Sequence, residues 1–84
     1  MPSISNFYGI AIKMYFRDSE HNPPHIHAIY GEYVGEIAIK NGELIMGDLP
    51  NKALNLTKEW VAIHKDELIK MWETGDISKL PPLI

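Results

Sequence analysis

The chain has 84 residues, of which 45% are hydrophobic and 23% are charged, the composition of an ordinary globular protein rather than of a disordered tail. A chain of this length predicts one domain, and the absence of cysteine excludes disulfides, thiolate zinc sites and cysteine nucleophiles. The formal net charge of -3 argues against a general electrostatic nucleic-acid binder, because such domains carry a basic excess.

The first half of the chain has the residue pattern of β-strands. In the segment "YGIAIKMYF" the apolar residues alternate with other residues, which predicts a half-buried strand. The polar segment that follows ends in Pro23 and Pro24, and these prolines predict a loop.

Two hairpins follow the loop. Gly31 and Glu32 suit a two-residue turn with glycine first, and Asn41 and Gly42 form the strongest short hairpin signal, because both tolerate positive φ. The predicted strands cover about residues 8–17, 25–30, 33–40 and 43–48. Together they predict a four-stranded antiparallel meander.

The second half of the chain changes to helical spacing. Apolar residues on one arc of a helical wheel predict one long helix over about residues 51–74, with Asn51 as the N-cap and Gly75 just past the end. The tail, residues 76–84, is extended by its prolines and is expected to pack back onto the domain. The sequence therefore predicts a single α+β domain over residues 1–84, with the meander covered on one face by a single long C-terminal helix.

Three of the four histidines lie between residues 21 and 27. His21 and His25 are four residues apart, but Pro23 and Pro24 exclude a helix there. His25 and His27 are two apart in a predicted strand, so they lie on the same face of the sheet.

Pairing the strand residues outward from the two predicted turns gives the cross-strand partners and separates the two faces of the sheet. It pairs His27 with Glu36, Ile37 with Met46 and Lys40 with Glu43. The face expected to meet the helix carries Ile10, Ile12, Met14, Phe16, Ile26, Ala28, Tyr30, Tyr33, Ile37, Ile39, Leu44 and Met46. The opposite, polar face carries Lys13, Tyr15, Arg17, His25, His27, Glu36, Lys40 and Glu43.

Three interpretations of the cluster of His25, His27 and Glu36 stay open. The simplest is a solvated sheet face without chemistry. The second is a site for zinc or another divalent transition metal, built from His21, His25 and His27 with Glu36, since neutral imidazoles suit zinc, nickel, copper and iron.

The third interpretation is proton transfer on a phosphodiester. His25 or His27 would act as the acid or base with Glu36 as partner, and the charge-stabilising residues would be Tyr15, Lys13 or Arg17. His64 lies on the apolar arc of the predicted helix, which favours a buried core histidine over a member of the site.

Three segments resemble one known family: "EHNPPHIHAIYGEY", "NGELIMGDLP" and "ALNLTKEWVAIHKDELIKMW". In this order they resemble the small bacterial family DUF4160, a domain of unknown function, over about residues 5–74. The family's motif positions fall on His21, Asn22, Pro23, Pro24, His25, His27, Gly31, Gly47, Leu49, Pro50, Trp60 and Trp72. The resemblance carries no catalytic or binding role with it.

The resemblance also implies a genetic setting. Members look like short stand-alone proteins encoded beside another small protein, an arrangement similar to toxin and antitoxin pairs. We therefore expect a cytoplasmic regulatory module that acts on a partner protein or RNA through the polar face, where the chain can also self-associate. The alternative is a divalent-metal-binding protein that uses the same histidines. No membrane association is expected, because the sequence has neither a signal-peptide pattern nor a spanning apolar run.

Overall fold

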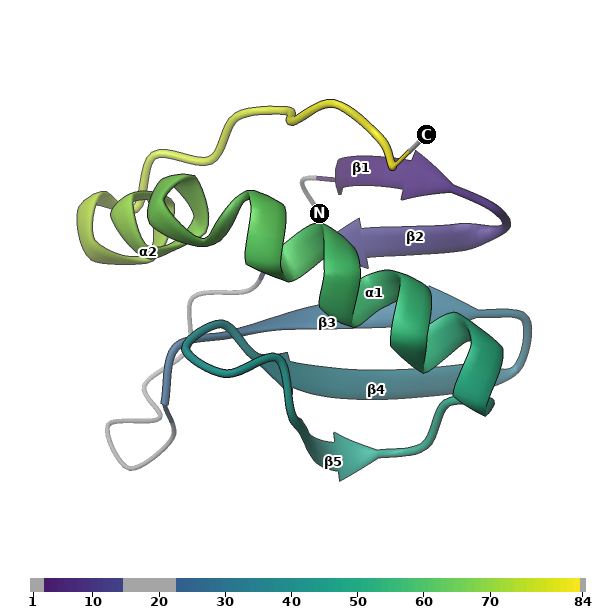
Figure 1. Ribbon diagram of the computed structural model, residues 1–84. Coiled ribbons are helices and arrows are strands. Elements are labelled where there is room, and N and C mark those ends of the chain that lie inside the picture. The colour runs from purple at the N-terminus through teal and green to yellow at the C-terminus, as the bar shows by residue number, and fades with distance from the viewer. Residues whose placement is uncertain (1–2, 15–22, 84) are drawn as a thin grey trace.

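An open antiparallel sheet of five strands, in the order β1-β2-β3-β4-β5, forms the frame of the computed structural model, which describes residues 3–14 and 23–83. The strands are β1 Ser3–Phe7, β2 Ile10–Lys13, β3 His25–Tyr30, β4 Tyr33–Ala38 and β5 Leu44–Gly47, and the helices are α1 Asn51–Ile63 and α2 Lys65–Thr74. Helix α1 crosses one face of the sheet, and α2 continues beyond its end (Figure 1). The α+β class is as predicted. The prediction of four strands and one long helix is wrong. In the described part of the chain, neither helix is long and apolar enough to cross a membrane.

The predicted strand over residues 8–17 is replaced by a hairpin of β1 and β2. Tyr8 and Gly9 form its turn with φ of 49° and 79°, so both lie in the left-handed region that a type I′ turn requires. Tyrosine is not a residue that signals such a turn, so the alternation of apolar residues predicted one uninterrupted strand. Ile4 and Phe7, which precede the turn, are buried and make β1 part of the core. Phe16 and the end of the predicted strand lie outside the described residues.

The hairpin of β3 and β4 has the predicted register. His27 lies opposite Glu36, His25 opposite Ala38, and Tyr30 opposite Tyr33. Gly31 takes a φ of 60° in the turn, which glycine adopts without steric cost. This pairing fixes which side chains share the polar face.

The register of β5 differs from the prediction. Asn41 and Gly42 belong to a longer turn, in which the Gly42 amide donates to the Ala38 carbonyl and the Asn41 Oδ1 accepts from the Glu43 amide. A bulge between β4 and β5 then places Met46 opposite Glu36 instead of Ile37, and Lys40 and Glu43 are not a strand pair. Met46 is therefore 61% exposed on the polar face and not buried under the helix.

The predicted single helix is divided at His64, whose φ of -107° and ψ of 20° depart from helical values. Asn51 is the first helical residue and Pro50 takes the N-cap position, without a side-chain cap bond. Gly75 ends α2 in the left-handed conformation, as predicted, and its amide donates to the Met71 carbonyl.

The core lies between the sheet and α1. It contains Ile4, Phe7, Ile10, Ile12, Met14, Ile26, Ala28, Ile37, Ile39, Leu49, Ala53, Trp60, Val61, Leu68 and Met71. Trp60 is fully buried at its centre, and its ring lies 5.7 Å from that of Phe7. The apolar face predicted from the strands is therefore the face that meets α1, but Tyr33 and Met46 are exposed and Phe16 lies outside the described residues.

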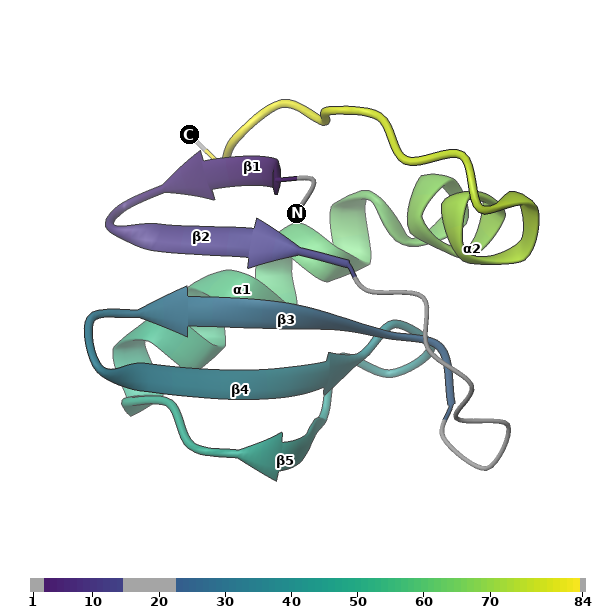
Figure 2. The same cartoon turned by 180° about the vertical axis from the view of Figure 1, so that it is seen from behind.

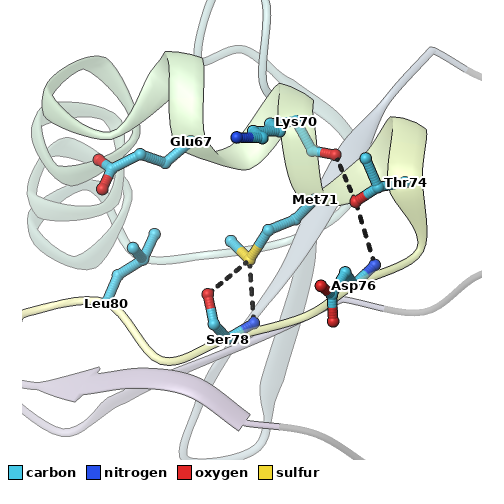
Figure 3. Close-up of a pocket in the computed structure, with 7 residues that line it drawn as sticks. All are labelled: Glu67, Lys70, Met71, Thr74, Asp76, Ser78 and Leu80. Atoms are coloured by element: carbon cyan, nitrogen blue, oxygen red, sulfur yellow. Dashed lines mark hydrogen bonds between the residues drawn. The ribbon is translucent and has the colours of Figure 1, made fainter.

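The C-terminal tail packs back as predicted and covers the free edge of β1. The Leu80 amide donates to the Ile4 carbonyl, and the Trp60 Nε1 donates to the Pro81 carbonyl. Nearer α2, the Ser78 amide donates to the Met71 sulfur, which ties the tail to the helix (Figure 3). Leu80 and Leu83 are partly buried against the core, and Ile84 lies outside the described residues.

Two glycines give a matched test of this architecture. A Cβ on Gly47, which has a φ of 82°, would collide with the Val34 carbonyl, whereas a Cβ on Gly31 would meet nothing within 4 Å. We expect Gly31→Ala to lower the free energy of unfolding by about 1 kcal/mol through backbone strain alone, and Gly47→Ala to lower it by more than about 3 kcal/mol. Urea unfolding measures both values. Equal losses would contradict the close packing of β5 on β4.

Candidate functional site

The two prolines before β3 fix the position of the His25 ring. The His25 Nδ1 lies 2.8 Å from the Pro23 carbonyl oxygen, and the Pro24 carbonyl accepts a hydrogen bond from the Ile39 amide. Proline has no amide hydrogen, so this segment presents carbonyls to its neighbours and cannot form a helix. The small side chain of Ala38, opposite His25 in the ladder, leaves room for the buried imidazole.

Glu36 projects between the two imidazoles that β3 delivers. Its Oε1 lies 3.5 Å from the His25 Nε2, and its Oε2 lies 3.4 Å from the His27 Nε2. The side chains of His25, His27 and Glu36 are 7%, 18% and 22% exposed. The site therefore opens to solvent on the side of His27 and Glu36, while His25 forms its inner wall.

The hydrogen bond to Pro23 determines which nitrogen of His25 carries the proton. A carbonyl oxygen can only accept, so Nδ1 must donate, and in a neutral ring Nε2 then presents a lone pair. That lone pair faces a carboxylate oxygen of Glu36, which also can only accept. Such a contact is favourable only when a cation, either a proton or a metal ion, lies between the two atoms.

The geometry of the cluster matches a small metal ion. His25, His27 and Glu36 each offer one ligand atom, and these atoms lie within 4.8 Å of one another. Bonds of about 2.0 to 2.2 Å in a tetrahedral zinc site put neighbouring ligand atoms about 3.4 Å apart. The two nitrogen–oxygen separations of 3.5 and 3.4 Å agree with that value. A histidine that ligates a metal also commonly donates its other N–H to a backbone carbonyl, as His25 does to Pro23.

Trp72 of α2 packs against His25, a contact that the sequence did not predict. The centroid of one of its rings lies 5.2 Å from that of His25, and the tryptophan is half-buried. Its position on the apolar arc predicted a core aromatic. No spacing along the chain could link it to His25, because the contact depends on where α2 leaves the end of the sheet.

The structure describes only some of the other predicted site residues. His21, Tyr15 and Arg17 lie outside the described residues, so their predicted roles stay predictions. Lys13 lies in β2 directly opposite His27, and directly opposed residues share a face of the sheet.

His64 is separate from the cluster. Its ring lies 5.0 Å from the Trp60 ring, and its Nδ1 lies 3.0 Å from the Glu67 Oε1. The expectation was a buried core histidine, but His64 is only partly buried and lies outside the core cluster. Its separation from the cluster makes His64 a natural control for experiments on His25 and His27.

Comparison with known proteins places the chain in a family. The family model described as "Domain of unknown function (DUF4160)" matches residues 9–73. The chain belongs to the DUF4160 family. Neither the curated proteins nor the solved structures gave a match. The DUF4160 match covers all of β3 and β4, so the cluster of His25, His27 and Glu36 lies within the family domain.

The tautomer of the neutral His25 ring can be measured directly. In metal-free protein at about pH 9, where free imidazole is neutral, we expect His25 to be the tautomer with hydrogen on Nδ1, because the Pro23 carbonyl holds that proton. Long-range ¹H–¹⁵N correlation spectra distinguish the two tautomers, and a His25→Gln variant assigns the signals. A ring with its proton on Nε2 would contradict the proposed orientation.

Proposed function

We propose that this member of the DUF4160 family binds a divalent transition-metal ion through His25, His27 and Glu36. One observation carries the proposal: the His25 Nε2 lone pair, fixed by the hydrogen bond from Nδ1 to Pro23, faces a carboxylate oxygen of Glu36 at 3.5 Å. A metal ion between these atoms would turn a contact between two acceptors into two coordination bonds.

The ligand set indicates which metals fit. Two imidazoles and one carboxylate suit zinc, and the same set of three ligands binds iron(II) in oxygenases. Calcium and magnesium fit poorly, because both prefer oxygen ligands. His21, predicted as a further ligand, is a candidate for the remaining coordination position of zinc.

Metal content tests the proposal. Untagged protein loaded with Zn²⁺ and desalted should hold close to one equivalent by elemental analysis, and His27→Ala and Glu36→Gln should each lose most of it. His64→Ala should retain the metal, because His64 lies outside the cluster. A His21→Ala variant shows whether that residue is a ligand. At a free Zn²⁺ concentration of 100 times Kd, binding should raise the free energy of unfolding by about 2.7 kcal/mol. Wild-type protein that holds no Zn²⁺ and shows no thermal shift would overturn the proposal.

Fluorescence gives an independent test of where the metal binds. Cu²⁺ or Ni²⁺ at the cluster should quench Trp72, whose ring lies against His25, whereas Zn²⁺ has a filled d shell and should not quench it. Trp72→Phe should remove most of the quenching and still bind the metal, leaving only the emission of Trp60. If the quenching survives this substitution, the paramagnetic ion binds elsewhere.

The predicted role of a toxin–antitoxin-type regulator stays a prediction. One feature favours a protein partner or a second copy of the chain over RNA: the exposed apolar side chains of Val34, Ile45 and Met46 along β4 and β5. Strand β5 forms an edge of the sheet and pairs with β4 alone among the described strands. Edges of this kind are common sites of strand addition.

A further inference from the structure

Lys13 adds a positive charge to the row of side chains that contains the candidate metal ligands. Across the polar face the register places Lys13 opposite His27, and His27 opposite Glu36. Directly opposed residues have Cβ atoms about 4.5 to 5.5 Å apart. Lys13 therefore flanks His27 on the side away from Glu36.

The ammonium group of Lys13 has no counter-ion in the described part of the chain. The three ion pairs found there join His25 and His27 to Glu36, and His64 to Glu67. Lys13 is half-buried, and Ser3 and His27, its neighbours in the ladder, carry no negative charge. An ammonium group that has no carboxylate partner among the described residues favours an anion from solution.

The charges of the loaded site indicate which anion. A divalent metal with two neutral imidazoles and the Glu36 carboxylate has a net charge of about +1, and Lys13 raises it to about +2. With His25, His27 and Glu36 as the protein ligands and His21 outside the coordination shell, a tetrahedral ion keeps one position for an outside group, as in catalytic zinc sites. A dianionic oxyanion can place one oxygen on the metal and another on the Lys13 ammonium.

The three candidate metal ligands differ in their exposure to solvent. The exposed fraction of the side chains increases from His25 to His27 and Glu36, so the exchangeable position faces solvent on the side of His27 and Glu36. Seen from behind, β2, β3 and β4 have no helix in front of them, because α1 lies on the far face of the sheet (Figure 2).

We infer that the metal-loaded site binds a phosphate group, of a phosphate monoester or of inorganic phosphate, between the metal ion and the ammonium of Lys13. This inference rests on the proposed metal site. It assigns Lys13 a binding role. The net charge of about +2 on the metal-loaded site, with Lys13 included, favours a ligand of this class.

The experiment uses Co²⁺-loaded protein, freed of excess metal, whose visible spectrum reports a change in coordination. Inorganic phosphate and a nucleoside monophosphate should each change the spectrum in a saturable way, and acetate should do so only at much higher concentration. Lys13→Gln should weaken phosphate binding by about tenfold or more, because a charge-assisted contact is lost. The same variant should bind Co²⁺ at least as tightly as the wild type does, because the lost charge repels the metal ion.

Lys58→Gln is the matched control, because it removes the same charge from an exposed position on α1, which packs on the other face. It should leave both affinities unchanged. Equal weakening of phosphate binding by both variants would mean general charge attraction and would overturn the role of Lys13. A site that binds Co²⁺ but shows no response to phosphate would overturn the inference and leave the metal site standing. Failure to bind Co²⁺ at all would overturn both.

Discussion

The hydrogen-bonded ladder between β3 and β4 is the constraint on which the candidate site depends. It sets Glu36 against His27 and brings the same carboxylate within 3.5 Å of His25. Because side chains alternate between the two faces of a strand, a slip of one residue would turn Glu36 into the core and Ile37 toward the histidines. The burial of Ile26, Ala28 and Ile37 under α1 prevents that slip. The core therefore holds the polar cluster in register.

A second constraint acts at the start of β3. The carbonyls of Pro23 and Pro24 accept from the His25 ring and from the Ile39 amide, so one short segment anchors both the imidazole and the end of β4. The ring is thereby oriented before any ligand arrives. Such a preset orientation lowers the cost of binding, because less side-chain freedom is lost when the ligand arrives. This is the physical reason why an otherwise ordinary polar sheet face is a candidate metal centre.

The helices support the site through packing, and α2 also contacts it directly. Helix α1 covers the sheet, and the break at His64 lets α2 continue beyond the end of the sheet, where Trp72 meets His25 (Figure 1). The tail then returns along β1 and covers that edge, while β5 is left as the open edge. The histidine cluster thus lies at one end of the sheet. The exposed apolar residues lie at the β5 edge.

The sequence by itself determined the features that depend on neighbours along the chain. The turn at Gly31 and the strict alternation around it gave the pairing of His27 with Glu36, and the two prolines excluded a helical metal motif. Gly75 likewise marked the end of the helical region. These are local effects of allowed φ values and of the two-residue period of a strand, so they can be read without a tertiary structure.

Tertiary structure decided the rest. The turn at Tyr8 places a side chain at positive φ, which packing of β1 and the tail must offset. The bulge that exposes Met46 follows Gly35, where a Cβ would collide with Leu44 and Leu49. The contact of Trp72 with His25 joins residues from two distant elements. Local pattern cannot fix such features, because they depend on how a whole set of packing contacts is satisfied at once.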